Sequence, residues 1–322
     1  MTLSSYPGGF NSGLSVRGIP LTQTFGTSFG PTQQTNTGVW WVDSVNGSGS
    51  IGSYTQPLAS LSRALALAKT YDVIIMKQGT TVTVSSATDA DALWSIAGLQ
   101  IIGLGTGAQR PTITLDTATT ATITVSAASV SVQNCIFAAN FLNIASLFTL
   151  TTAKDFVVDG CTIQDTSAVL NFVNVVSTSA TSNANDGLTL NNNKIVLKHA
   201  TAANKLVSAL GTHDNVTISN NIYTAATTDT GAVIPITNGK VLTNTNVLNN
   251  IFSLQQTTGV ATGILITTNG STNSGMIAGN FIQGLDATTE ILVTASSGFL
   301  FSQNYYSGAA DKSGYLLPAA DA

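Results

Sequence analysis

The chain has 322 residues, of which 11 are Lys or Arg and 15 are Asp or Glu, so charged residues make up 8% and the formal net charge is −4. The cations are scattered singly and leave no basic patch that could neutralise a phosphate backbone, so nucleic acid is not an expected partner. Although 43% of the residues are hydrophobic, no apolar run approaches the roughly 18 residues of a membrane-spanning helix, and no membrane partner is expected.

Residues 1–38 are expected to form an extended N-terminal arm. They carry no repeat and are rich in Gly, Pro, Thr and Ser, a composition typical of a segment that is disordered or held by a partner. An extended segment can lie along an exposed strand and place alternate side chains in pockets. The apolar anchors are Tyr6, Phe10, Val16, Ile19 and Leu21, with Arg17 as the one charged residue among them. The start, MTLSSYPGGF, lacks the basic and apolar regions of a secretory signal, so synthesis in a cytoplasm is expected.

The pattern of residues 39–70 predicts a strand, a Gly-Ser loop and a helix that caps the open end of a β-structure. Pro57 suits the first turn of a helix, and an apolar stripe at helical spacing follows it. The stripe consists of Leu58, Leu61, Leu65 and Ala68. Such a helix covers strand edges that would otherwise invite aggregation.

A short phrase recurs through residues 71–308 at intervals of about 24 to 32 residues. It is an alternating apolar run, a polar or small residue and an apolar restart, as in VTISNNIY, where Val216, Ile218 and Ile222 are expected to share one face. A strand-like repeat of this length predicts a stacked solenoid. The fold class is therefore all-β, a single-stranded right-handed parallel β-helix of about eight coils. Residues 177–187 and 198–211 are expected to project as loops, and residues 309–322 to form a C-terminal cap or tail.

Aligned on the last polar residue before the restart, the phrases give one column along the solenoid. Strands of successive coils lie about 4.8 Å apart, so Asn residues at one corner can pass amide hydrogen bonds from coil to coil. Asn also tolerates the left-handed conformation that a sharp corner needs. The column is therefore expected to be structural. Its members are Cys135, Cys161, Asn193, Asn221, Asn250, Asn280 and Asn304.

The two cysteines leave two alternatives open. Adjacent coils would bring Cys135 and Cys161 within the range that a disulfide requires. A reducing compartment and an inward position instead favour two packed thiols, which are the expected state.

The sequence shows no constellation that we can assign to catalysis. Polysaccharide lyases and hydrolases need paired carboxylates, or clustered Asp with an Arg or Lys base, whereas this chain has one Glu, Glu290, and three Arg. The best carboxylate group is Asp155, Asp159 and Asp165, all in one coil. Asp159 falls at a corner, where a turn role is the simpler explanation, so no catalytic residue is predicted.

No metal or cofactor site is predicted either. His213 and Asp214 are neighbours, but neighbouring side chains on a strand point to opposite faces and cannot share a site. The two His, at positions 199 and 213, and the two Cys do not have the spacing of zinc ligands.

The first third of the chain resembles a known family. YPGGFNSGLSVRGIPL, GVWWVDSVNGSGS, SYTQPLASLSRAL and YDVIIMKQGTTVTV resemble the amino-terminal half of tailed-bacteriophage virion proteins with a single-stranded right-handed β-helix, of the head decoration or head fibre type and more distantly tailspikes. The resemblance covers roughly residues 6–107, and its helix and following strand are shared by pectate-lyase-like folds generally. Where some relatives carry a Pro-Gly-His phrase, this chain has Lys77, Gln78 and Gly79, which removes the one His that the family could have offered as a site.

The resemblance implies a homotrimeric structural protein without enzymatic activity. Its arm would dock on the major capsid protein or another virion protein, and its β-helix would point outward. One rival is a tailspike or tail fibre that binds and cleaves host surface polysaccharide in a groove. Another is a glycan-binding adhesin that uses exposed aromatic residues such as Tyr223, Tyr305 and Tyr306.

Overall fold

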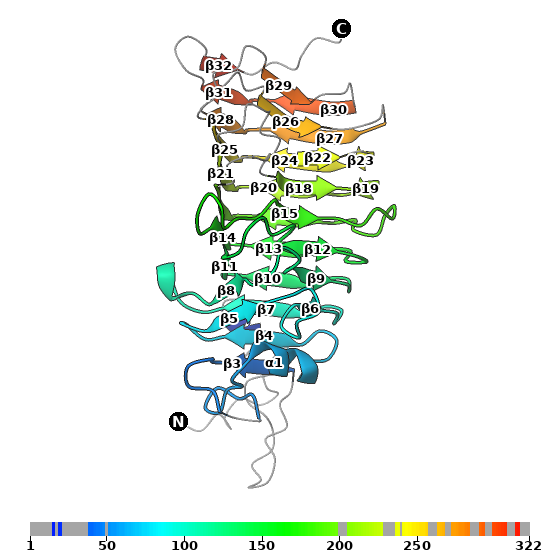
Figure 1. Ribbon diagram of the computed structural model, residues 1–322. Helices are drawn as coiled ribbons and strands as arrows, with labels where there is room; N and C mark the ends of the chain where they lie inside the picture. Colours follow the sequence, from blue (N-terminus) through cyan, green and yellow to red (C-terminus); the bar gives the residue numbers. More distant parts are fainter. Residues whose placement is uncertain are drawn as a thin grey trace, which may run out of the picture.

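The chain forms a right-handed parallel β-helix, seen along its whole length in Figure 1. The computed structural model describes residues 15–16, 19–20, 38–48, 51–198, 205–227, 236–238, 240–256, 263–267, 272–283, 290–293, 298–307 and 313–315. Within these residues, three long sheets run along the solenoid, and each coil from β4 (Val73–Met76) to β29 (Glu290–Val293) contributes one strand to each sheet in turn. At the carboxyl-terminal end, β32 (Ser313–Tyr315) pairs antiparallel with β31 (Tyr305–Ser307). The fold class predicted from the repeat is therefore confirmed.

The sheets are numbered here in the order in which a coil crosses them. Sheet 1 contains β3 (Val39–Val42), β4 (Val73–Met76), β7 (Gln100–Gly103), β10 (Ser131–Gln133), β13 (Val157–Asp159), β16 (Thr189–Asn191), β20 (Thr217–Ser219), β24 (Thr245–Leu248), β27 (Ser274–Ala278) and β30 (Gly298–Ser302). Sheet 2 contains β5 (Thr81–Val84), β8 (Thr112–Leu115), β11 (Ile136–Ala139), β14 (Thr162–Asp165), β17 (Lys194–Leu197), β21 (Ile222–Thr227), β25 (Ile251–Gln256), β28 (Phe281–Gln283), β31 (Tyr305–Ser307) and β32 (Ser313–Tyr315). Sheet 3 contains β6 (Leu93–Trp94), β9 (Ile123–Val125), β12 (Phe148–Leu150), β15 (Asn174–Ser177), β18 (Lys205–Ala209), β22 (Ile236–Asn238), β26 (Gly263–Thr267) and β29 (Glu290–Val293).

The parallel register stacks like residues on like from coil to coil. In sheet 1 one buried position is paired from β7 to β27 and holds branched apolar side chains in these strands. This column consists of Ile101, Val132, Val158, Leu190, Ile218, Val247 and Ile277. Such a continuous apolar column forms the core and fixes the register, because a slip by one residue would expose every member.

A left-handed residue forms the corner between sheet 1 and sheet 2 in each of the repeated phrases. The residues at this position have φ between 50° and 67°, and they are Asn134, Gly160, Asn192, Asn220, Asn249, Gly279 and Gln303. They come immediately before the column predicted from the sequence, so the left-handed conformation belongs to the neighbour of each column residue and not to the column itself. Asn and Gly suit it because they adopt positive φ at low cost.

This corner corrects one detail of the predicted alternation. Val216 and Ile218 are buried as expected, but Ile222 is 47% exposed, whereas Tyr223 is fully buried. The left-handed Asn220 turns the chain so that Asn221 points inward. The alternation therefore restarts one residue later than a continuous strand would place it.

The predicted cap helix is present but begins later than expected. Helix α1 spans Leu61–Leu67 at the amino-terminal end of the stack, with Ser60 as its N-cap (Figure 1). Its residues Leu61, Ala64 and Leu65 are buried against the core. Pro57 precedes the helix, and Leu58 instead forms a parallel bridge to β3. The Ser60 hydroxyl accepts the Arg63 N–H at 3.2 Å. This side-chain cap fixes the start of the helix after Ser60 and not at Pro57.

The remaining connections differ from expectation in one place. Residues 178–187 connect β15 to β16 without a strand, as predicted. The predicted loop at 198–211 is wrong in part, because residues 205–209 form β18 and bury Leu206, Val207 and Ala209. A strand buried on both faces lacks the alternation by which strands are recognised. A short helical turn, η3 (Gly107–Gln109), lies between β7 and β8, and β19 (His213–Asp214) pairs with β23 (Leu242–Thr243) beside sheet 1.

Candidate functional site

An asparagine ladder occupies the corner between sheet 1 and sheet 2 in the later coils. Asn193 donates from Nδ2 to Asn221 Oδ1 at 3.0 Å and to the Val158 carbonyl at 2.9 Å, and its backbone N–H also donates to Asn221 Oδ1. The same three bonds recur one coil later between Asn221 and Asn250. They continue through Asn280 to Asn304. Every amide in the ladder is at most 2% exposed, so the ladder supports the fold and offers no surface to a ligand.

The ladder ends at Cys161, whose backbone N–H donates to Asn193 Oδ1 at 2.9 Å. Cys135 and Cys161 are both buried and both carry free thiols, as expected. Burial raises the pKa of the Cys135 thiol well above its ordinary value and raises the pKa of Cys161 to about 12. Both groups therefore remain protonated and unreactive at neutral pH.

Two members of the column were missed from the sequence. The register of β5, β8 and β11 places Thr80 and Pro111 at the same corner as Cys135. Thr80 follows the left-handed Gly79, which repeats the corner geometry of the later coils, so a glycine before a strand was the available signal. Pro111 follows η3, so the corner in this coil is longer than in the others and does not match the repeated phrase.

The three carboxylates of the candidate catalytic group do not converge. Asp155 lies in a turn with φ of 54°, and Asp159 lies on the outer face of β13, where it accepts a hydrogen bond from Asn191 Nδ2 at 2.8 Å. Asp165 points into the core and is 2% exposed. A pair of catalytic carboxylates must face one substrate, whereas Asp159 faces outward and Asp165 faces the core.

Asp165 connects two loops from inside the core. Its Oδ1 accepts the Phe172 N–H at 2.8 Å, and its Oδ2 accepts the Lys198 N–H at 2.6 Å. Burial raises the pKa of this carboxyl to about 7, and the two N–H groups and the Lys198 charge oppose the shift only in part. The side chain is enclosed, so its geometry indicates a structural link and not a group that contacts a substrate.

His213 and Asp214 face opposite ways, as expected for neighbours on a strand. His213 is 1% exposed and its Nε2 lies 2.8 Å from Thr178 Oγ1. Burial lowers the pKa of His213, which favours its neutral form. Asp214 accepts bonds on the outside from Thr243 and Asn244, and these bonds lower its pKa. His199 lies outside the described residues, and so do the contacts of the Glu290 side chain in β29.

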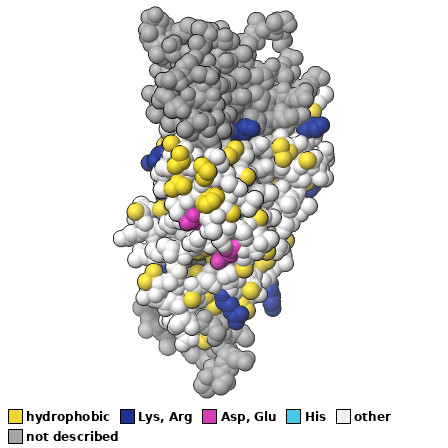
Figure 2. All heavy atoms as spheres, in the orientation of Figure 1, with side chains coloured by type: hydrophobic (Ala, Val, Ile, Leu, Met, Phe, Trp, Pro, Cys, Tyr) yellow, Lys and Arg dark blue, Asp and Glu magenta, His cyan; other side chains and the backbone are white. Residues whose placement is uncertain are grey.

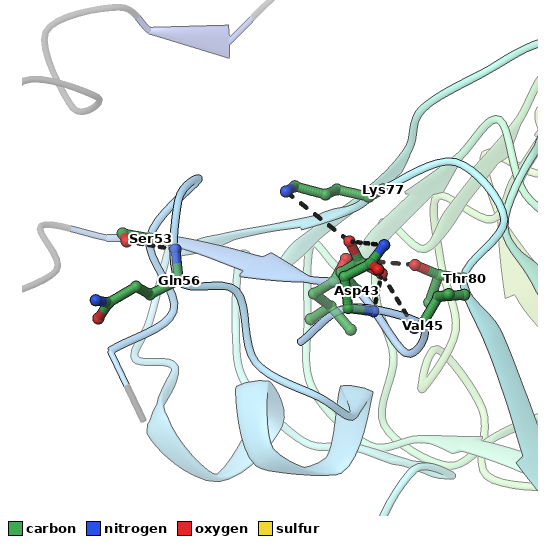
Figure 3. Close-up of polar contacts among 8 residues, drawn as sticks. Asp43, Val45, Ser53, Gln56, Lys77 and Thr80 are labelled. Carbon is green, nitrogen blue, oxygen red and sulfur yellow. Dashed lines mark hydrogen bonds and ion pairs between the residues drawn. The ribbon is translucent and has the colours of Figure 1, made fainter. Parts of the chain in front are cut away.

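A small polar cluster joins the end of β3 to the end of β4 in the next coil. Lys77 Nζ reaches Asp43 Oδ2 at 3.9 Å, as Figure 3 shows, and lies 4.5 Å from the centroid of the Tyr54 ring. Asp43 also accepts the N–H groups of Val45 and Asn46. These bonds lower the pKa of Asp43 despite its burial. Asp43 therefore holds the turn, and Lys77 pairs with its charge.

The aromatic residues named for the adhesin alternative are only partly available. Tyr223 is fully buried, which overturns the expectation that it is exposed and follows from the later restart of the alternation. Tyr305 is 40% exposed on sheet 2, and the Tyr306 side chain lies outside the described residues. The carbohydrate platform of three tyrosines is therefore not formed.

Most of the predicted docking residues of the arm lie outside the described residues, namely Tyr6, Phe10, Arg17 and Leu21. Val16 and Ile19 belong to two short strands, β1 (Ser15–Val16) and β2 (Ile19–Pro20), which pair antiparallel. At these four residues the arm forms a short antiparallel pair of strands.

The described residues form neither a metal-binding cluster nor a membrane-spanning helix. No group of three or more His, Cys, Asp or Glu side chains in these ranges is placed to hold a metal ion. No helix among the same residues is long and apolar enough to cross a membrane.

Comparison with known proteins shows the fold and no family. No protein-family model and no curated protein matches the chain. The native crystal structure of GH136 lacto-N-biosidase from Eubacterium ramulus is similar with a TM-score of 0.56 and 11% identity, over 83% of this chain and 56% of that chain. This chain therefore spans little more than half of that enzyme.

Two further structures are more distant. The selenomethionine derivative of the same enzyme has a TM-score of 0.43 and 10% identity, over 83% of this chain and 67% of that chain. A rhamnogalacturonan lyase has a TM-score of 0.37 and 10% identity, over 81% and 86%. Of the three structures, the native lacto-N-biosidase has the highest TM-score, and at 11% identity that likeness shows the fold alone.

Proposed function

We propose that this chain is a non-enzymatic structural protein of tailed-bacteriophage virions, a homotrimeric β-helix that decorates the capsid through its N-terminal arm. The observation that carries the proposal is the use of the carboxylates. Asp43 and Asp214 hold turns or neighbouring polar side chains, Asp165 is enclosed in the core, and Asp159 bonds to the next coil. Carboxylates committed in this way support a scaffold, whereas a glycosidase needs two that face a shared groove.

The resemblance of residues 6–107 supplies the virion location and the capsid as partner. The composition of the solenoid agrees with a role in packing. The face seen in Figure 2 has few dark blue or magenta side chains, and most of its described atoms are white. A surface of Thr, Ser and Asn with few charges can pack against other copies at a low cost of desolvation.

The experiment that tests this proposal separates docking from folding. Deletion of residues 1–30 is expected to leave a folded β-helix that no longer binds virus particles lacking the protein. Within the full chain, Arg17→Ala is expected to weaken binding, because Arg17 would contact a carboxylate or carbonyl group on the capsid. Arg63→Ala on the exposed face of α1 is the matched control and should bind like wild type. Wild-type occupancy by the deleted protein would place the docking site elsewhere.

A polysaccharide-active tailspike is the second candidate, favoured by the structural likeness to lacto-N-biosidase. In that case carboxylates from coil loops or a neighbouring subunit would converge on a glycan. Incubation of the purified protein with envelope polysaccharides, followed by measurement of reducing ends and unsaturated sugars, distinguishes the two. Release of either product would overturn the non-enzymatic proposal.

A further inference from the structure

Exposed apolar side chains line both sides of the asparagine corner in the last coils. On sheet 2, Ile222, Ile251, Phe281 and Tyr305 occupy one outward position in register, with exposed fractions of 47%, 41%, 37% and 40%. On sheet 1, Met276 and Leu300 are paired in register and are 39% and 66% exposed. These six residues are called the apolar ridge below.

In the two coils before the ridge begins on each sheet, the same outward positions hold polar side chains. In sheet 2 the two preceding members of the column are Thr162 and Lys194, and in sheet 1 they are Thr217 and Asn246. From β20 to β31, the strands of sheets 1 and 2 contain no charged residue. A contiguous exposed apolar surface without charges marks an interaction site more often than a solvated face.

The geometry of the ridge suits a second copy of this chain. Met276 and Phe281 lie in one coil and Leu300 and Tyr305 in the next, on the two sheets that meet at the corner. Both columns run along the solenoid in steps of about 4.8 Å. A copy with a parallel axis therefore presents the same columns at the same heights, and sheet 1 of one copy can face sheet 2 of the next.

Charges below the ridge are complementary in the same arrangement. Lys194 is exposed at the lower end of the sheet 2 column, and Asp159 points outward from sheet 1 one coil below. Neither side chain has an ion-pair partner among the described residues. When sheet 1 of one copy faces sheet 2 of the next, the offset between these groups is about one coil, which a lysine side chain spans.

We propose that the apolar ridge is the interface through which copies of this chain associate side by side, with sheet 1 of one copy against sheet 2 of its neighbour. Such a contact is heterologous, because it joins two different surfaces. It closes into a ring when the rotation that relates neighbouring copies divides evenly into a full turn. The inference rests on the self-association within the proposed function and does not depend on a virion location.

The test compares the mass in solution of matched surface variants. Wild type is expected to be a trimer by light scattering at micromolar concentration. Phe281→Glu and Leu300→Glu should each weaken association by at least about tenfold, because a buried glutamate at a hydrophobic contact is strongly unfavourable. Val169→Glu is the control, since Val169 is 59% exposed in the turn between sheets 2 and 3. Circular dichroism should show an unchanged fold in all three variants.

The ion pair offers a second test that does not touch the ridge. Lys194→Asp should weaken association, and Asp159→Lys added to it should restore much of the loss because the charges are exchanged. A monomeric wild type would overturn the proposal, as would wild-type mass in both glutamate variants. Release of sugars from a polysaccharide would overturn the proposed function and leave these masses unaffected, so the two failures are distinguishable.

Discussion

In the coils before β16, the corner between sheets 1 and 2 is occupied by Thr80, Pro111, Cys135 and Cys161, whereas after β16 it is occupied by asparagine at every described step. The two regions also fill their cores differently. The earlier coils contain a cluster of four large aromatic rings, and the later coils pair Tyr223 with Phe252 at 5.8 Å. One fold is therefore stabilised by side-chain packing at one end and by a hydrogen-bonded ladder at the other.

The outer surfaces follow the same division. Ion pairs such as Lys77–Asp43 and Lys154–Asp186 lie on the earlier coils, while the apolar ridge lies on the later ones. A ladder that satisfies every buried amide holds register without help from the surface. The exposed apolar residues of the later coils are therefore not needed to hold the register and are available for contact with another molecule.

The largest expected effect is loss of the aromatic cluster in the earlier region. Phe148 contacts three rings, Trp94, Phe137 and Phe156, at centroid distances of 5.8, 5.1 and 5.1 Å. Phe148→Ala leaves a cavity among them and should cost about 3–5 kcal/mol of unfolding free energy. Denaturant unfolding measures the change, with Thr124→Ala on the outer face of β9 as control. Equal stability of the two variants would show that packing does not dominate in this region.

The next effect concerns Asp165, which lies in the last coil before the ladder. Burial raises its folded pKa to about 7 from an ordinary 3.8, and Lys198 and Tyr223 are the groups that interact with its charge. The folded state therefore favours the protonated acid. Its contribution is fully present below about pH 4 and is lost as the pH rises to about 7 and above, by up to about 4 kcal/mol.

Comparison of pH profiles isolates this contribution from those of other groups. As the pH rises from 4 to 8, the unfolding free energy of wild type should fall relative to that of Asp165→Asn, because only wild type carries the buried carboxyl. Gln164→Ala, on the outer face of β14 beside Asp165, is the control and should retain the wild-type profile. A profile for Asp165→Asn parallel to wild type would mean that the carboxyl titrates normally in the fold.

A smaller effect is expected from breaking the ladder in the later region. Asn221→Leu keeps a similar volume but deprives the Asn193 N–H and Nδ2 of their shared acceptor and leaves the Leu190 carbonyl without its donor. Buried groups left without partners cost about 1–3 kcal/mol. Asn246→Ala, on the outer face of β24, is the control and should change stability by about 0.5 kcal/mol or less. If Asn221→Leu and Asn246→Ala unfold at the same midpoint temperature, the ladder does not stabilise the fold.

The repeat and the ladder residues could be predicted because a solenoid uses one local pattern many times, and identical neighbours such as Asn193 and Asn221 reveal the stacking. The direction of side chains after the corner could not, because one left-handed residue, Asn220, shifts the alternation and moves Tyr223 inside and Ile222 outside. The ridge was missed for the same reason. Its first member, Ile222, is predicted to lie on the inner face, and only the register shows that it shares an outer column with Ile251, Phe281 and Tyr305.

The least disruptive test extends the ladder by one coil. Cys161 already donates its N–H to Asn193 Oδ1, and its Sγ lies 3.8 Å from the Val132 carbonyl. An amide at this position could donate to both oxygens and accept the Cys135 N–H, so Cys161→Asn should stabilise the protein by about 1 kcal/mol. Cys135→Asn should instead destabilise it by about 1–3 kcal/mol, because the residue below is Pro111, which has no N–H to offer the new oxygen. Opposite shifts of the two unfolding midpoints would establish that backbone donors determine where the ladder stops, and equal shifts would rule this out.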